Sequence, residues 1–254
     1  MILALRLFMT PLLIAATTLA GRRWGPGFSG WLIGFPLTSG PVSLILALQY
    51  GPPFAAQAAI GNIGGLASIC AFSLAYCLIA PRANWLVSAS AGIVLFLVAT
   101  LVWNSFTMTL LPTCVITLVA LVLMVRLIPL RPMAAATAGT PRWDIPLRMV
   151  VATTFVVTLT GFATVLGPQL SGLITPFPVF AVVLAVFTHH QQGAQAAIQV
   201  LRGLGLSLFG CTAFFLVVGS LLPGLAIGWT YVLATLTTLA VNAISLRLGG
   251  SYSA

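Results

Sequence analysis

The residues of this chain best suited to bind a solute occur in pairs with one constant spacing. The two members of each pair lie 142 positions apart, and the pairs are Ser29 and Ser171, Phe35 and Phe177, Pro36 and Pro178, Gln49 and Gln191, and Arg6 and Arg148. Hydroxyl and amide groups can replace the water around a solute, and a guanidinium group binds anions well. The pairing therefore predicts a binding site to which both halves of the chain contribute.

The two Phe-Pro dipeptides lie well inside apolar stretches. A proline within a helix removes one backbone hydrogen bond and opens the helix one turn earlier. In a membrane such a break is tolerated only against protein or a water-filled cavity, and broken helices frame the binding sites of many transporters. Phe35 and Phe177 would then line or gate that site. The alternative is that the breaks are kinks for helix packing and that both rings pack in the core.

The paired arginines and glutamines each have two interpretations. Arg6 and Arg148 would sit at opposite membrane faces and attract an anion at each mouth, or each would snorkel from a helix end. Gln49 and Gln191 lie at the ends of the interrupted stretches, where an amide can cap a carbonyl or coordinate a solute. Arg202, inside a later apolar stretch, either snorkels to the membrane surface or meets an anionic headgroup or substrate.

The chain has few groups for catalysis or metal binding. Its one acidic residue, Asp144, falls in the polar stretch 126–148, which joins the fifth and sixth expected helices, and we expect Asp144 to lie in a loop. The apolar stretches contain no carboxylate, the usual carrier of protons or sodium in membranes. His189 and His190 are adjacent and would point apart on a helix, and none of the four cysteines has zinc-site spacing. We therefore expect no enzyme, no catalytic residue, no metal and no cofactor.

The composition is that of a protein whose main solvent is lipid. Hydrophobic residues make up 60% of the chain and charged residues 4%, whereas a soluble domain carries roughly a quarter charged residues. The mean hydropathy is +1.16. The net charge of +9 comes from ten arginines scattered singly or in pairs. Because no basic stripe alternates with aromatic residues, nucleic acid is excluded as a partner.

Hydrophobic runs divided by Gly, Pro and Arg predict about nine transmembrane helices. A helix of roughly 20 apolar residues spans the bilayer, and such helices are expected near residues 2–20, 27–48, 54–80, 84–104, 107–128, 145–165, 168–188, 196–222 and 225–246. The loops after the first, third and fifth helices, the start of the sixth and eighth, and the end of the ninth then share one side.

The arginines give this arrangement an orientation. The shared side carries Arg22, Arg23, Arg82, Arg126, Arg131, Arg142, Arg148, Arg202 and Arg247. Only Arg6 lies on the other side. Cytoplasmic segments of membrane proteins are enriched in basic residues. We therefore expect the N-terminus outside and the C-terminus in the cytoplasm.

The spacing of 142 extends beyond the paired site residues and indicates an internal repeat. Further matches are Gly25/Gly167, Pro26/Pro168, Gly30/Gly172, Gly51/Gly193, Gln57/Gln199, Gly61/Gly203 and Pro81/Pro223. The chain then divides into a four-helix repeat (1–106), a connecting helix and cytoplasmic loop (107–143) and a second four-helix repeat (144–254). The repeats are five helices apart, an odd number, so they are inverted in the membrane.

The expected fold class is therefore an all-α polytopic membrane protein with a 4+1+4 inverted repeat and broken second and seventh helices. Inverted repeats are a recurrent plan of transporters, since a site between the halves can face either side of the membrane. The alternative is a duplication that serves packing alone, as in a scaffold.

A stretch in each half has the pattern of a known family. It consists of Gly172, Leu173, Ile174, Phe177, Pro178, Gly193 and Ala196 in the second half and of Gly30, Ile33, Phe35, Pro36 and Gly51 in the first. This pattern resembles the GlpM-like small inner-membrane proteins. The resemblance implies a four-helix membrane unit without a defined chemistry. This chain differs by fusing two such units through an extra helix.

These features predict a transporter or channel for a small solute in the inner membrane of a bacterium. An anion is mildly favoured because arginines are in excess and acids are missing from the membrane segments. One alternative is a flippase for lipids or lipid-linked molecules, and the other is a non-transporting scaffold subunit. The expected partners are the lipid bilayer and a small solute or anionic headgroup, and a homodimer or an envelope-complex partner stays open.

Overall fold

The structure is a computed structural model that describes residues 2–106, 109–128, 143–165 and 177–248. Every regular element in these ranges is an α-helix, so the predicted all-α class is confirmed for them. The helices are α1 (Ile2–Trp24), α2 (Pro26–Ile33), α3 (Ser39–Tyr50), α4 (Pro52–Ile79), α5 (Trp85–Asn104), α6 (Leu110–Leu127), α7 (Asp144–Val165), α9 (Val179–Gln192), α10 (Ala194–Leu221) and α11 (Ile227–Leu248).

Five of the described helices, α4, α5, α6, α10 and α11, are long and apolar enough to cross a membrane. Many of their large side chains face outward: Leu101, Leu111 and Leu236, for example, are more than half exposed. An exposed apolar surface of this extent fits a bilayer and does not fit water. The described fold is thus that of a helical protein compatible with a multi-pass membrane location.

The stretch that contains the first Phe-Pro dipeptide is interrupted in the structure. Helix α2 ends at Ile33 and α3 begins at Ser39, so Phe35 and Pro36 lie in the gap between them. Beyond the proline the backbone recovers its pairing, since the Gly40 amide donates to the Pro36 carbonyl over 2.8 Å. The second dipeptide stands at the start of a helix, with Pro178 as the N-terminal cap of α9. Residues 166–176, which precede it, lie outside the described part.

Three glycines, Gly25, Gly51 and Gly193, join consecutive helices in nearly the same unusual backbone conformation. Gly51 links α3 to α4 with φ 88° and ψ 164°, and Gly193 links α9 to α10 with φ 88° and ψ 173°. This region of backbone space is open almost only to glycine. Each glycine therefore permits a sharp change of direction between the two helices that it joins.

Helix boundaries recur at the spacing seen in the sequence. Boundaries that lie 142 positions apart are the starts of α1 and α7 (Ile2, Asp144), the ends of α3 and α9 (Tyr50, Gln192), both ends of α4 and α10 (Pro52–Ile79, Ala194–Leu221) and the starts of α5 and α11 (Trp85, Ile227). The packing partners correspond as well: α4 packs on α5 as α10 packs on α11, and α3 packs on α4 as α9 packs on α10.

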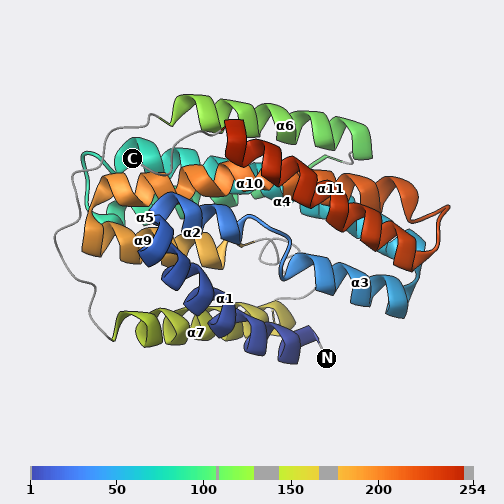
Figure 1. Ribbon diagram of the computed structural model, residues 1–254, viewed down its shortest axis with the longest axis horizontal. Helices are drawn as coiled ribbons and strands as arrows, with labels where there is room; N and C mark the ends of the chain where they lie inside the picture. Colours follow the sequence, from blue (N-terminus) through green and yellow to red (C-terminus); the bar gives the residue numbers. More distant parts are fainter. Residues whose placement is uncertain (1, 107–108, 129–142, 166–176, 249–254) are drawn as a thin grey trace.

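Helices α4 and α10 cross at the centre of the molecule and run in opposite directions (Figure 1). Near one end of the crossing, a Cβ at Gly219, late in α10, would lie 3.7 Å from the Cβ of Ala59, early in α4. Helix α6 packs against both α4 and α10, and α1 packs against α7. The buried core between these helices includes the large side chains of Phe72, Tyr76 and Phe215.

Helix α2 reaches the centre by close backbone contact with α10. A Cβ at Gly30 would clash with the carbonyl oxygen of Val200, and a Cβ at Gly203 would clash with that of Gly27. Small residues at such a crossing let two backbones approach closely, which is how helices gain packing in a membrane. This contact places the start of α2, with Pro26 and Ser29, beside the start of α10 and the end of α9.

Many helix ends meet at one end of the molecule, which we call the arginine end. Here the end of α1 meets the start of α7, the end of α9 meets the end of α4, and the start of α10 meets the end of α6. Arg22, Arg148 and Arg202 belong to these contacts.

Candidate functional site

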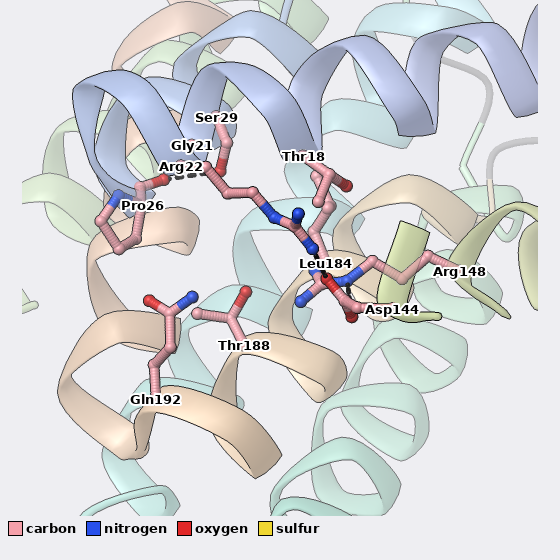
Figure 2. Close-up of a pocket in the computed structure, with 10 residues that line it drawn as sticks. All are labelled: Thr18, Gly21, Arg22, Pro26, Ser29, Asp144, Arg148, Leu184, Thr188 and Gln192. Carbon is pink, nitrogen blue, oxygen red and sulfur yellow. Dashed lines mark hydrogen bonds and ion pairs between the residues drawn. The ribbon is translucent and has the colours of Figure 1, made fainter. Parts of the chain in front are cut away.

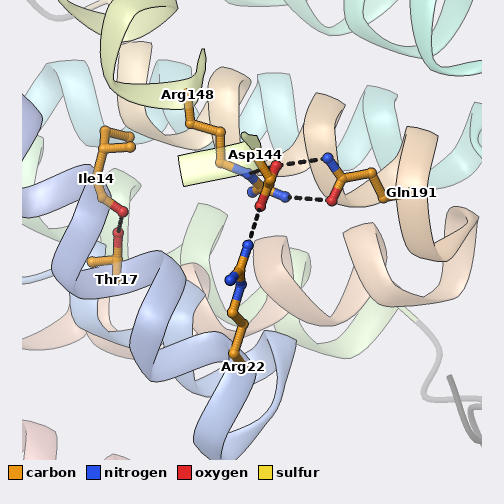
Figure 3. A network of polar contacts seen from close by, with 6 residues as sticks. All are labelled: Ile14, Thr17, Arg22, Asp144, Arg148 and Gln191. Carbon is orange, nitrogen blue, oxygen red and sulfur yellow. Dashed lines mark hydrogen bonds and ion pairs between the residues drawn. The ribbon is translucent and has the colours of Figure 1, made fainter. Parts of the chain in front are cut away.

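Asp144 is the centre of a buried polar network at the arginine end (Figure 3). Its carboxylate, on the first residue of α7, is 0% exposed. The Oδ1 atom accepts hydrogen bonds from Arg148 Nε at 2.7 Å and from Gln191 Nε2 at 2.6 Å, and Oδ2 accepts one from Arg22 Nη2 at 3.0 Å. Two guanidinium groups and an amide thus hold the carboxylate in its charged form.

The network ties three helices from distant parts of the sequence together. Arg22 comes from the last turn of α1, Asp144 and Arg148 from the first turns of α7, and Gln191 from the last turn of α9. Arg148 also donates from Nη2 to Gln191 Oε1 at 3.2 Å, and its guanidinium lies 5.1 Å from the centre of the Phe187 ring. Arg148 is buried, whereas the side chain of Arg22 is 30% exposed.

A small polar cavity lies beside the network, and we call it the Arg22 cavity (Figure 2). It is lined by Thr18, Gly21, Arg22, Pro26, Ser29, Asp144, Arg148, Leu184, Thr188 and Gln192. Its volume is about 20 Å³, room for about one water molecule. Helices α1 and α2 of the first half and α7 and α9 of the second half supply the lining. The cavity therefore lies between the two halves of the chain.

The charges at the cavity do not cancel. Arg22 and Arg148 carry two positive charges and Asp144 carries one negative charge, which leaves one positive charge in excess. Arg22 and Arg148 both contact the Asp144 carboxylate, and the side chain of Arg22 is 30% exposed. A polar lining with a net positive charge attracts anions rather than cations.

The structure brings several of the predicted site residues together here. Arg148 and Gln191 are in the network, and Ser29 lines the cavity, where its hydroxyl donates to the Pro26 carbonyl at 2.8 Å. Gln49, the counterpart of Gln191, is exposed at the end of α3. Ser171 and the side chain of Arg6 lie outside the described part of the structure.

The two phenylalanines and two prolines of the predicted site are not among the residues that line the cavity. Phe35 packs edge-on against Trp31 with ring centres 4.8 Å apart. Phe177 stacks on Phe155 at 5.5 Å and meets Phe96 edge-on at 5.4 Å. These contacts match the packing alternative, in which the rings fill space between helices. Pro36 lies in the break between α2 and α3, and Pro178 caps the start of α9.

The expectation that Asp144 lies in a loop is wrong, because it is the first residue of α7 and is fully buried. The sequence analysis also missed Arg22, Thr18, Thr188 and Gln192 as cavity residues. One signal could have revealed the network: Asp144 and Arg148 are four positions apart, the spacing of an ion pair on one helix face. The chain has one acidic residue and ten arginines, so an ion pair between Asp144 and an arginine is expected.

Arg202 contacts the end of a neighbouring helix, and its two expected roles at the membrane surface stay predictions. Its Nη1 atom donates to the carbonyl of Ile128 at 2.8 Å, at the C-terminal cap of α6. Cations favour this position because the last carbonyls of a helix lack partners and carry partial negative charge. Arg202 thus fixes the end of α6 to the start of α10.

The last turn of α9 is held on its other side by α4. The Tyr76 hydroxyl lies 3.0 Å from His189 Nδ1 and donates to the Ala185 carbonyl at 3.3 Å. His190 points elsewhere, with its ring edge-on to Trp85. Within the described ranges, no three metal-binding side chains gather at one point. The histidines therefore position α9, from which Thr188, Gln191 and Gln192 reach the site.

Comparison with known proteins adds no relative to this picture. No family model, no curated protein and no solved structure matches the chain. The resemblance to the GlpM-like proteins therefore stays a prediction. The fold and the site by themselves define an all-helical protein, compatible with a membrane, with a cationic cavity between its halves.

Proposed function

We propose that this protein is a membrane transporter or channel for a small solute, and that the solute is an anion. Its binding site lies at the interface of two inverted repeats, at the Arg22 cavity. No catalytic step is part of this proposal.

The observation that carries the proposal is the position and charge of the Arg22 cavity. Helices α1 and α2 line it from the first half and α7 and α9 from the second, and it carries one excess positive charge. Buried charge is costly in a chain with this apolar surface, so a polar cavity between two halves points to a functional site. A movement of one half relative to the other would widen the cavity.

The recurrent helix boundaries support the inverted repeat. Equivalent helices begin 142 positions apart, and the central pair α4 and α10 runs antiparallel. The same holds for α1 and α7, since the end of α1 meets the start of α7 at the pair Arg22 and Asp144. Two antiparallel, equivalent units can exchange conformations of similar energy, which is the basis of alternating access.

The gathering of helix ends at the arginine end supports the proposed orientation. Basic residues favour the cytoplasmic side of a membrane. We therefore place the arginine end and the C-terminus in the cytoplasm and the N-terminus outside, in a bacterial inner membrane. The Arg22 cavity is then the cytoplasmic mouth of the transport path.

Solute flux into liposomes tests the proposal. The purified protein is reconstituted, and uptake of chloride, nitrate, phosphate, a neutral sugar and an amino acid is measured together with the scrambling of a fluorescent lipid. Protein-free liposomes are the control. We expect saturable flux of at least one anion. Scrambling of lipid alone would replace the proposal with the flippase alternative, and the absence of both activities would favour the scaffold alternative.

A further inference from the structure

Two tyrosine hydroxyl groups join the two halves of the chain. Tyr76 on α4, in the first half, donates to the Ala185 carbonyl of α9 at 3.3 Å and lies 3.0 Å from His189 Nδ1. Tyr231 on α11, in the second half, has its hydroxyl oxygen 2.7 Å from that of Ser43 on α3. We call these the Tyr76 contact and the Tyr231 contact. Each one crosses from one half of the chain to the other.

The two contacts reach equivalent helices at equivalent positions. Ser43 and Ala185 are 142 residues apart, so they correspond in the proposed repeat. The tyrosines do not correspond, because they belong to α4 and α11, which are not equivalent helices. The recurrence is therefore not a simple result of duplication: two different helices supply a hydroxyl group to the same point of α3 and α9.

The two contacts lie at opposite ends of the molecule. Tyr76 is in the last turn of α4, which meets the end of α9 at the arginine end. Tyr231 is in the second turn of α11, beside α3. Figure 1 shows α9 towards the left of the molecule and α3 at the right. Each end therefore has one tyrosine that ties a helix of one half to a helix of the other.

Helices α3 and α9 each end at a glycine that can act as a hinge. Gly51 and Gly193 follow them, both with φ 88°. Hinges in proteins are a few positions at the ends of elements that absorb changes in φ and ψ. At the other end, the backbone is interrupted before α3, and Pro178 caps α9. The tyrosine hydrogen bonds therefore fix two short helices that can pivot about a glycine.

Helix α9 forms a wall of the Arg22 cavity next to the Tyr76 contact. Leu184 and Thr188 line the cavity, and Ala185 and His189 directly follow them in the sequence. Successive residues of a helix are about 100° apart around its axis, so the two pairs lie on adjacent faces of α9. Movement of α9 away from Tyr76 therefore changes the width of the cavity.

We propose that Tyr76 and Tyr231 are positioning residues that keep the two ends of the transport path closed. Loss of the Tyr76 contact lets α9 move and opens the arginine end. Loss of the Tyr231 contact lets α3 move and opens the opposite end. This inference concerns the regulation of the proposed transport site and rests on the proposed function for its meaning in transport.

Buried reporter cysteines measure opening at each end without any transport. Thr188→Cys on α9 reports on the arginine end. Ala47→Cys on α3 reports on the other end, because Ala47 lies one turn after Ser43 on the same helix face. Thr188 is 4% exposed and Ala47 1%, so N-ethylmaleimide reacts with either cysteine only when its helix moves and admits water. The four native cysteines are also buried, and the protein without a reporter gives the background rate.

Each reporter is combined with Tyr76→Phe or Tyr231→Phe, and labelling of the purified protein in detergent is followed by mass spectrometry. Loss of one hydrogen bond changes a conformational equilibrium by about two- to tenfold. We expect Tyr76→Phe to raise the labelling rate of Thr188→Cys by this factor and to leave that of Ala47→Cys unchanged. Tyr231→Phe should do the reverse. Tyr50→Phe, at a tyrosine that is 64% exposed, is the matched control and should change neither rate.

The outcomes separate this inference from the transport proposal. Increases specific to one end would support the two contacts as closures, even if liposomes showed no solute flux and the transport proposal failed. Equal increases at both ends in either variant would show that the tyrosines stabilise the fold as a whole. Unchanged rates in both variants would show that the hydrogen bonds do not hold the helices. Either of these two results would overturn the inference, and solute flux would then leave the transport proposal standing.

Discussion

At the scale of single residues, Asp144 is a buried charge that depends on several partners. It is fully buried and its negative charge is balanced by Arg148 and Arg22, with Gln191 as a third donor. Burying an ion pair gains little on its own, because desolvation offsets the attraction. Removing one member, however, leaves the others buried and unpaired. The network is therefore sensitive to substitution of Asp144.

We expect Asp144→Asn to destabilise the protein by about 3–5 kcal/mol, since it leaves two neighbouring cations without their anion. Equilibrium unfolding in mixed detergent measures this change. Arg82→Gln, at an exposed position after α4, is the control and should change the free energy of unfolding by less than about 0.5 kcal/mol. The double variant Asp144→Asn/Arg148→Gln should recover part of the loss. A change of less than about 1 kcal/mol in Asp144→Asn would show that the network is not structurally important.

Part of this site could be predicted from the sequence, because some of its residues recur 142 positions away in the other half of the chain. Arg148, Gln191 and Ser29 were found through their counterparts, and all three lie at the cavity or in its network. Arg22 and Asp144 were not found because neither has a charged counterpart: the positions 142 residues away hold Thr164 and Ile2. Each also stands at a helix end, where a loop was equally plausible. A partner chosen across 122 positions of sequence depends on packing, which the sequence pattern does not contain.

At the scale of helices, the sequence predicted the elements better than their contacts. Gly51 and Pro52 mark the start of α4 and Gly193 marks the start of α10, as expected from the rules for helix ends. The Phe-Pro break in the first half is present between α2 and α3. The antiparallel crossing of α4 and α10 could only be anticipated from the repeat, because their interface consists of small and apolar residues common throughout the chain.

A cysteine pair tests this crossing. The ideal Cβ position at Gly219 lies 3.7 Å from the Cβ of Ala59, close to the separation of about 3.8 Å found in disulfides. We expect Ala59→Cys/Gly219→Cys to cross-link on mild oxidation. A protease site inserted in the 129–142 segment then yields two fragments that separate only after reduction.

The control pair is Leu78→Cys/Gly219→Cys, because Leu78 is at the opposite end of α4 and exposed. This pair should give fragments that separate without reduction. Equal cross-linking of both pairs, or efficient cross-linking of the control alone, would contradict the antiparallel arrangement of α4 and α10.

At the scale of the whole molecule, an apolar exterior surrounds a cavity that is charged and shared between the halves. The outward leucines and valines suit a bilayer, while two arginines and one aspartate are among the residues that line the Arg22 cavity. This contrast is the physical basis of the proposed transport. The four arginine and glutamine positions predicted as a symmetric set do not behave alike, since Arg148 and Gln191 are in the site and Gln49 is exposed.

The most direct test of the transport account is anion flux into liposomes by wild type, Arg22→Gln and Arg23→Gln, each checked for folding by thermal unfolding. Arg22 lines the cavity, whereas its neighbour Arg23 lies against Trp24. We expect Arg22→Gln to lower the initial rate of anion uptake at least about tenfold, because it removes a charge-assisted contact with the solute, and Arg23→Gln to retain the wild-type rate. Equal rates in wild type and a folded Arg22→Gln variant would contradict the assignment of the Arg22 cavity as the transport site.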